Sequence, residues 1–559
     1  MAIRWSDDGR TFKITIDSVL GGISRGFFPE RDDQFHASIA INPYEALGAN
    51  LPKRSTGFLM PTGYAKFSGT SIQSRPMWII KSPKLNGNSE PYVYYYESNG
   101  KFGAFTATTI GNGAIKTADC ASTPNNLPIA ITNGNGSGAA YYNNYVYCCV
   151  SDDVSRYGPI NSAAGLDASN GIAEDVWTGA TLGTQTALTD TTYPSSIPNH
   201  PMHVHPHDNR LYFGDFKNGQ GMIHYIETKM TTYEGDTNNG SLYNALDLPF
   251  GYAPTDIESY GKYLVVSAIQ TTSSSTNQGN ASLFFWNTDV YADSYDFEVP
   301  LLDPLVTSML NINGTLYIFT GLIAGGVRLC KYLGGYSVGT EFIWEEGTAP
   351  LAGAVEAMGE AIVFPINITY PETSASLFTW GGKGVPFESA LHNIAQCSDT
   401  GQADTRIYSI AQIVQIYHYQ TPQFILGWYR SGTTGGFDEY SNTKGVAIYR
   451  SNFFNIGQRF QITKLKLSFA EDIGANNTLI PKLFFDDIDV DATKTLTTIN
   501  NTNAPGALSY TYRDELDACI GDHNFFIELR WSGSVILPVQ LPIIIEGKLL
   551  EDNEPYNAP

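Results

Sequence analysis

Cysteine and long apolar runs are both scarce in this sequence, and each scarcity excludes a class of protein. Six cysteines among 559 residues are too few for a disulfide scaffold, and none belongs to a CxxC pair of the kind that binds zinc. We expect these thiols to be reduced and buried. No window approaches the roughly 18 apolar residues of a membrane-spanning helix, so no membrane span is expected. The first ten residues lack the apolar core of a signal peptide, which favours synthesis in a cytoplasm.

Basic side chains are also in short supply. Lysine and arginine together number 33, against 55 aspartates and glutamates, which gives a formal net charge of −22. Surfaces that bind nucleic acids depend on clustered lysine and arginine, because these side chains neutralise phosphates. The composition therefore argues against a DNA- or RNA-binding protein, although a small basic patch on an acidic surface stays compatible with it.

Aromatic residues and glycine, by contrast, are abundant. The chain contains 34 tyrosines, 29 phenylalanines, 54 glycines and 29 prolines. Aromatic and β-branched residues suit a pleated, half-buried surface, and glycine and proline supply turns. Few stretches carry an apolar stripe with helical spacing. The sequence therefore predicts an all-β protein with many short strands.

Short aromatic and β-branched runs recur along the chain at a regular interval. Their starts are 53, 66, 52, 53, 45 and 62 residues apart, which is the spacing of propeller blades with loop insertions. Tight turns precede several runs, and a further aromatic strand follows most of them. We predict a degenerate, about seven-bladed β-propeller; a pair of β-sandwiches is the alternative. The runs are Tyr92–Tyr96, Tyr145–Cys149, Leu211–Phe213, Tyr263–Val266, Leu316–Phe319, Ala361–Phe364 and Gln423–Trp428.

The two ends of the chain do not follow this repeat. Residues 1–75 are rich in proline and predict an extended arm on a neighbouring surface, or the strand that closes the ring. We assign residues 76–445 to the propeller. Residues 446–559 contain cleaner alternating strands, such as Phe460–Phe469 and Phe525–Trp531, which predict a C-terminal β-sandwich.

Histidines gather at one place in a chain that has only nine. The spacing of His203, His205 and His207 would put their side chains on one face of a strand, with Asp208 next to them. These four residues are the candidate metal ligands. The competing interpretation is that they are packed or channel-lining histidines of a blade's inner strand, and we expect no bound metal.

Two sets of carboxylates are candidates for binding or catalysis. The run Asp486, Asp487, Asp489 and Asp491 has calcium-like spacing but lacks the glycine and glutamate of an EF-hand loop, so a solvated turn is favoured. Glu258 and Glu356 occupy equivalent places in two repeats and could both reach the channel. Such a pair is compatible with a glycosidase and equally with a structural role.

Known catalytic and cofactor-binding motifs are missing. The sequence has no nucleophile elbow, Walker loop, HExxH or dinucleotide fingerprint, so we expect no enzyme activity and no cofactor. Trp5–Phe12 (WSDDGRTF) resembles a shortened Asp-box, the turn motif of sialidase-like propeller blades, with Phe12 in place of tryptophan. That resemblance implies a stabilised turn rather than an activity.

The opening Arg4–Gly9, the aromatic repeats and the segments Phe453–Phe469, Asn524–Trp531 and Ile543–Glu546 together resemble structural proteins of tailed bacteriophages. The resemblance implies a non-enzymatic virion component made in the host cytoplasm, in the nozzle, tip or adaptor region of the tail or as a stabilising protein. Its expected partners are other tail proteins and further copies of itself in a symmetric oligomer. An acidic lining would also let DNA pass without specific binding.

Two other functions stay open at this stage. A tail protein that binds or depolymerises a host-surface glycan would use the abundant tyrosine and tryptophan, because aromatic faces stack on sugars. A cellular scaffold propeller that binds peptides is less favoured, because the WD signature is missing and a sandwich follows the repeats.

Overall fold

The computed structural model is built almost entirely from β-strands, so the all-β prediction is confirmed. It describes residues 3–24, 34–41, 58–59, 64–66, 76–81, 92–97, 102–106, 138–150, 153–158, 172–175, 200–217, 219–226, 244–270, 279–290, 292, 294–322, 325–358, 361–368, 371, 373–381, 390–397, 406–413, 423–429, 435–440, 447–486, 494–533 and 537–551. Over these residues, no helix is long and apolar enough to cross a membrane.

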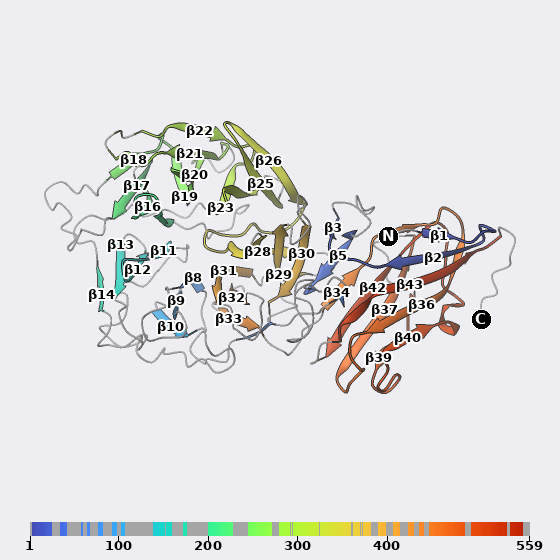
Figure 1. Ribbon diagram of the computed structural model, residues 1–559. Coiled ribbons are helices and arrows are strands. Elements are labelled where there is room, and N and C mark those ends of the chain that lie inside the picture. Colours follow the sequence, from blue (N-terminus) through green and yellow to red (C-terminus); the bar gives the residue numbers. More distant parts are fainter. Residues whose placement is uncertain are drawn as a thin grey trace.

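Seven small antiparallel sheets form a ring, which Figure 1 shows at the left. The first strands of most successive sheets contact one another around the centre, and the first strand of the last sheet returns to contact that of the first sheet. This is the arrangement of a β-propeller, and we call these first strands the inner strands. In spatial order the sheets are β10 (Phe102–Thr106), β9 (Tyr92–Glu97) and β8 (Pro76–Lys81); β11 (Ala139–Tyr142), β12 (Tyr145–Val150), β13 (Asp153–Gly158) and β14 (Ile172–Asp175); β15 (Met202–His205), β16 (Arg210–Lys217), β17 (Gln220–Ile226) and β18 (Asn244–Asp247); β19 (Tyr252–Tyr260), β20 (Tyr263–Gln270), β21 (Ser282–Trp286) and β22 (Phe297–Pro300); β23 (Leu305–Ile312), β24 (Thr315–Gly321), β25 (Val327–Gly334) and β26 (Ser337–Trp344); β27 (Glu356–Met358), β28 (Ala361–Ile368), β29 (Ser374–Gly381) and β30 (Ala390–Gln396); and β31 (Arg406–Ile413), β32 (Gln423–Tyr429), β33 (Gly435–Tyr440) and β7 (Tyr64–Lys66).

The recurring runs of the sequence all lie in the second strand of a sheet. They correspond to β9, β12, β16, β20, β24, β28 and β32. This position is flanked by strands on both sides, and most of its described side chains are buried, as in Leu264–Ile269 of β20. Burial on both faces explains why these runs are continuously apolar rather than alternating.

Two larger sheets make up a second region, which we call the two-sheet unit (Figure 1, right). Phe460 and Leu465 of one sheet pack with Phe525 and Leu529 of the other in a shared apolar core. One sheet contains β1 (Ile3–Trp5), β2 (Thr11–Ile16), β43 (Val539–Leu549), β36 (Phe460–Phe469) and β40 (Ser509–Tyr512), with β41 (Ile520–Gly521) on β36 and β6 (Phe58–Leu59) on β43; the other contains β38 (Lys494–Thr495), β37 (Asn477–Phe485), β42 (Asn524–Gly533), β34 (Ala447–Arg450) and β5 (Ala37–Ile39), with β35 (Phe454–Asn455) on β42 and β39 (Ile499–Asn500) on β37. A short parallel pair, β3 (Gly22–Ile23) and β4 (Gln34–Phe35), and one 3-10 turn, η1 (Asp514–Leu516), complete the described elements.

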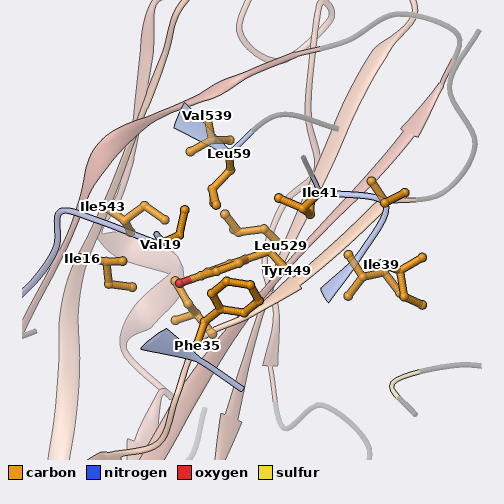
Figure 2. Packing of buried hydrophobic residues seen from close by; sticks show 14 of the residues in the cluster. Ile16, Val19, Phe35, Ile39, Ile41, Leu59, Tyr449, Leu529, Val539 and Ile543 are labelled. Atoms are coloured by element: carbon orange, nitrogen blue, oxygen red, sulfur yellow. The ribbon is translucent and has the colours of Figure 1, made fainter. Parts of the chain in front are cut away.

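The N-terminal segment contributes strands to both regions. β7 is the fourth strand of the last ring sheet, whereas β2 and β6 pair with β43 and β5 pairs with β34. Figure 2 shows Val19, Phe35 and Leu59 of this segment among Tyr449 and Leu529 of the two-sheet unit. Between the regions, the Asn393 side chain on β30 accepts a hydrogen bond from the Ala40 amide at 3.2 Å. The same segment therefore closes the ring and completes the second core.

A β-bulge near the start of the inner strand recurs in several ring sheets. The register shifts between Pro254 and Asp256 in β19, and between Val306 and Ser308 in β23. β8 and β31 carry the same irregularity. A bulge bends its strand and redirects the side chain that follows it. In β19 that residue is Asp256, whose carboxylate reaches the neighbouring inner strand.

Candidate functional site

Polar side chains concentrate on the inner strands of four successive sheets, at the end where each inner strand turns back into the second strand. We call this set the inner-strand cluster. Its members come from β15, β19, β23 and β27, and the bulge-directed Asp256 lies beside them. The cluster consists of His203, His205, Glu258, Ser259, Asn311 and Glu356.

Ser259 is the residue that joins β15 to β19. Its hydroxyl oxygen lies 2.6 Å from Nε2 of His203 and 2.7 Å from Nδ1 of His205. Because a hydroxyl donates a single proton, at least one of the two imidazoles must donate to it. Burial lowers the pKa of His203 to about 4 and also lowers that of His205. Both rings are therefore neutral at neutral pH, and the contact is a hydrogen-bond bridge rather than an ion pair.

Glu258 lies next to this bridge and is only 13% exposed. Its Oε1 accepts a hydrogen bond from the Ser259 amide at 2.7 Å and lies 3.6 Å from Nε2 of His203. Burial raises the pKa of Glu258 to about 7, and the charge of Glu356 raises it further, whereas the amides of Ser259 and Asn311 lower it. The two glutamates that sequence analysis paired are thus electrostatically coupled across the intervening strand β23.

Asp256 connects the inner strands β19 and β23. Its Oδ2 accepts a hydrogen bond from the Met309 amide at 2.6 Å, and its Oδ1 accepts one from the Ile257 amide at 2.8 Å. Burial raises the pKa of this carboxyl group to about 8, and the nearby charge of Glu258 also raises it, although both amides lower it. Asn311 adds a second tie, because its Nδ2 donates to the Ser259 carbonyl at 2.6 Å.

The hydrogen bonds that Glu258 and Ser259 already make decide which chemistry this cluster can perform. A glutamate with a pKa near 7 beside a second carboxylate has the acidity of a general acid. Its carboxylate, however, accepts from backbone amides of its own and the next inner strand, and Ser259 is occupied by two histidines. These groups hold neighbouring blades together, which favours a structural interpretation of the cluster.

A second polar group is fully enclosed in the sheet of β16 and β17. The Asp215 carboxylate lies 3.7 Å from Nδ1 of His200 and 3.6 Å from Nε2 of His224, and all three side chains are buried. His200 also contacts the Gly214 carbonyl at 2.9 Å through Nδ1. His200, although it lies only three residues before His203 in the sequence, therefore belongs to a different cluster.

The four candidate metal ligands do not converge on one point. His203 and His205 do share a face, because both reach Ser259. The ring of His207 stacks beside His205 at 6.0 Å, while Asp208 accepts from the Tyr212 hydroxyl at 2.5 Å. Wherever residues are described, no group of three or more His, Cys, Asp or Glu side chains is arranged to hold a metal ion.

The acidic run at the end of β37 stabilises a turn through its first residue. Asp486 has a positive φ of 61° and accepts hydrogen bonds from the amides of Asp522, His523 and Asn524 at 2.7–2.9 Å. Burial acts to raise its pKa, but these three amides lower it overall. Asp487, Asp489 and Asp491 lie outside the described residues.

The Asp-box-like sequence forms the β1–β2 hairpin turn. Asp8 accepts from the Ser6 hydroxyl and from the Arg10 amide, the latter at 3.0 Å, and Gly9 has a φ of 67°. The hydrogen bond from Ser6 is the main reason that the pKa of Asp8 is lowered. The rings of Trp5 and Phe12 meet edge to face at 5.7 Å. The turn lies in the two-sheet unit rather than in a blade, which the motif itself did not indicate.

Sequence reasoning missed three residues of the inner strands: Asp256, Ser259 and Asn311. Ser259 follows Glu258 directly, and Asn311 occupies the place of Ser259 in the next blade, since Ser259 pairs with Leu264 and Asn311 with Leu316. The sequence signal that could have identified them is the presence of polar residues in an otherwise apolar strand. Among the described cysteines, Cys330, Cys397 and Cys519 are buried.

Comparisons with known proteins show similarity to solved structures alone. No family model and no curated protein matches the sequence. The SapL1 lectin in complex with α-methyl fucoside is 10% identical, with a TM-score of 0.34, over 58% of this chain and 98% of its own. An exo-β-1,3-galactanase from Phanerochaete chrysosporium with β-1,3-galactotriose is 9% identical, with a TM-score of 0.28, over 74% and 96% of the two chains. The β-propeller domain of Myceliophteria thermophila Cps50 (Swd1) is 12% identical, with a TM-score of 0.37, over 68% and 99%. Similarity at these levels carries no argument about function.

Proposed function

We propose that this chain is a non-enzymatic structural protein of a tailed-phage virion, placed in the tail and assembled as a symmetric oligomer. The observation that carries the proposal is the N-terminal segment shared by the two regions. Since β7 completes the ring while β2, β5 and β6 complete the two-sheet unit, the propeller and the unit are joined by paired strands rather than by a single linker. A body joined in this way is suited to transmit force between neighbours in an assembly.

The use of polar groups in the propeller supports the non-enzymatic part of the proposal. Asp256 and Ser259 each join two inner strands, and Glu258 accepts from backbone amides. Buried polar groups that are satisfied in this way rigidify a structure.

Exposed apolar side chains at equivalent blade positions support contacts with other proteins. Phe250 precedes β19 and is 76% exposed, and Leu302 precedes β23 and is 80% exposed. Both therefore lie at the connection from the outer strand of one blade to the inner strand of the next. Repeated exposed apolar residues of this kind mark interaction surfaces.

Purified virions provide the test of this function. Mass spectrometry should detect the chain in purified particles at a fixed copy number, and native mass spectrometry of the isolated protein should show a closed oligomer. The paired variant Phe250→Asp and Leu302→Asp should fold normally and enter particles less efficiently, with Leu508→Asp, at an exposed site of the two-sheet unit, as the control. A chain that stays monomeric and never accompanies particles would contradict the proposal.

A further inference from the structure

A group of aromatic side chains surrounds the junction between the blades of β19–β22 and β23–β26, near the inner-strand cluster. Tyr260 and Tyr263 flank the tight Gly261–Lys262 turn that connects β19 to β20. Tyr332 and Tyr336 flank the turn that connects β25 to β26. We call these four residues the tyrosine face. Phe285 of β21 and Phe297 of β22 lie between the two pairs.

The rings of this face are held in fixed orientations by their contacts. Tyr260 meets Tyr332 edge to face at 5.3 Å, and Tyr263 meets Phe297 in the same way at 5.7 Å. Tyr336, which is 74% exposed, meets Phe297 at 6.0 Å. Edge-to-face contacts of this kind fix ring geometry as well as burying area. A ligand would therefore meet a preorganised surface.

The turn that carries Tyr336 is itself fixed. The Tyr332 hydroxyl donates a hydrogen bond to the Gly335 carbonyl at 2.9 Å. Gly334 and Gly335 have φ values of 102° and 58°, which a residue with a side chain would adopt only under strain. The exposed ring of Tyr336 is thus presented by a constrained turn and not by a loose loop.

Hydroxyl groups converge on this face together with the rings. Tyr260 and Tyr332 are in direct ring contact, and Tyr263 and Tyr336 both contact the ring of Phe297, which places the four tyrosines around one aromatic group. Within the part of the chain that is described, the hydroxyls of Tyr260, Tyr263 and Tyr336 have no hydrogen-bond partner, and none of these atoms is a buried orphan. They are accessible to water and to a ligand.

We propose that the tyrosine face binds a neutral glycan. A pyranose ring presents C–H groups that stack on an aromatic face and hydroxyl groups that exchange hydrogen bonds with phenols, and this surface offers both on rigid supports. Lys262 covers one face of the Tyr263 ring at 5.0 Å, so the ring of Tyr336, which is 74% exposed, is the one on which a sugar would stack.

Titration of the full chain with defined sugars tests this site. We would measure binding of maltohexaose, cellohexaose and chitohexaose by calorimetry, and screen an array of neutral and acidic glycans in parallel. At least one neutral glycan should bind. Tyr336→Ala should weaken that binding by about tenfold, which corresponds to about 1.4 kcal/mol. Tyr336→Phe, which keeps the ring and removes the hydroxyl, should weaken it by about threefold.

Trp5→Ala is the control, because Trp5 is an exposed aromatic residue of the two-sheet unit that lies outside the tyrosine face. Its affinity for the glycan should equal that of the unmodified chain. Failure of every glycan to bind, binding of acidic glycans alone, or equal affinities in the unmodified chain and Tyr336→Ala would each overturn the proposal. The proposal would also be overturned if Tyr336→Ala lost a protein–protein contact while the unmodified chain bound no glycan. None of these results bears on the presence of the chain in virions, which mass spectrometry decides separately.

Discussion

Different interactions hold neighbouring elements together in the propeller and in the two-sheet unit. Neighbouring inner strands of the propeller belong to different sheets, so they share no backbone ladder. Side chains bridge them instead, as Asp256 does to the Met309 amide and Ser259 does to two histidines. In the two-sheet unit, long ladders such as that of β36 with β43 satisfy the backbone, and apolar faces fill the space between the sheets.

This difference teaches where each region is vulnerable. An apolar core is sensitive to lost volume and is nearly insensitive to pH. A region held by buried carboxyl and imidazole groups is sensitive to lost hydrogen-bond partners and to ionisation. The two-sheet unit also contains a buried ionic group: the fully buried Glu528 lies 2.6 Å from Nε of Arg450, 3.5 Å from Nε of Arg530 and 3.7 Å from Nζ of Lys482.

The largest expected effect is a cavity in the two-sheet unit. Leu529 is completely buried between the sheets, so Leu529→Ala should lower the free energy of unfolding by roughly 2–5 kcal/mol. Chemical denaturation followed by circular dichroism measures this loss. Leu508→Ala, at a residue that is 56% exposed, is the control and should change stability by less than about 0.5 kcal/mol. Equal effects at the two positions would contradict the proposed core.

The free energy of unfolding of the propeller should fall as pH rises, because the buried carboxyl group of Asp256 loses its proton. The folded carboxyl group keeps its proton up to a pKa of about 8, whereas the ordinary value is 3.8. The stability that this group contributes is therefore complete below the ordinary pKa and is lost as pH rises through the folded value. Glu258 acts in the same direction, because its pKa is raised to about 7.

Asp256→Asn isolates this contribution. The hydroxyl oxygen of the protonated Asp256 carboxyl group can still accept a hydrogen bond, whereas the amide nitrogen of an asparagine cannot. The variant should therefore lose one of the bonds from the Met309 and Ile257 amides and be less stable by about 1–3 kcal/mol near pH 5. The difference in stability between parent and variant should shrink toward about pH 9, because the parent is destabilised as Asp256 loses its proton and the variant has no such proton. Urea denaturation across this pH range measures both stabilities. A deficit that grows with pH would contradict the raised pKa.

Removing the hydroxyl of Ser259 should cost less. Ser259→Ala leaves two buried imidazole nitrogens without their shared partner and should lower stability by about 1–2 kcal/mol. Ser308→Ala is the matched control: Ser308 is also buried on an inner strand, but its hydroxyl has no hydrogen-bond partner. Thermal unfolding should therefore show a loss for the first variant and none for the second. A comparable loss in both would mean that the Ser259 bridge contributes nothing.

The smallest effect is expected at the Asp486 turn, and its pH dependence has the opposite sign. Although burial acts to raise it, the pKa of Asp486 is lowered by three backbone amides. Its contribution is present above the ordinary value of 3.8 and is lost as pH falls through the folded pKa. Asp486→Asn keeps a residue that tolerates positive φ and should cost about 1 kcal/mol near pH 7. The difference in stability between variant and parent should shrink steadily as pH falls below 3.8 in a denaturation series. A difference that is independent of pH in this range would contradict the ionic origin of the effect.

Much of the fold was predictable from short-range patterns. The seven aromatic runs, from Tyr92–Tyr96 to Gln423–Trp428, correctly marked the second strands, because a strand covered on both sides is continuously apolar. Alternation in Phe460–Phe469 was predictable too, but the shift in its phase that leaves both Ile462 and Leu465 buried was not. A bulge between Ile462 and Lys464 causes it, and bulges depend on the partner strand β43.

The candidate site was less accessible to sequence reasoning. His203 and His205 were identified as same-face residues from their spacing, and the equivalence of Glu258 and Glu356 followed from the repeat. Their shared partner Ser259 lies 56 positions from His203 and 54 from His205. The bond of Asp256 to Met309 spans 53 positions. Contacts at such separations leave no local pattern, because they depend on how one blade lies against the next.

The sequence by itself determined that this chain is all-β, acidic and built from repeated aromatic strands, because composition and side-chain period act locally along the backbone. Tertiary structure decided how those strands are joined and used. It placed β7 in the last blade and β2 in the second core, joined Ser259 to two histidines, and brought four tyrosines from two blades together. Each of these arrangements depends on pairing between distant segments, where the gain in buried area and satisfied hydrogen bonds belongs to the whole fold and to no local segment.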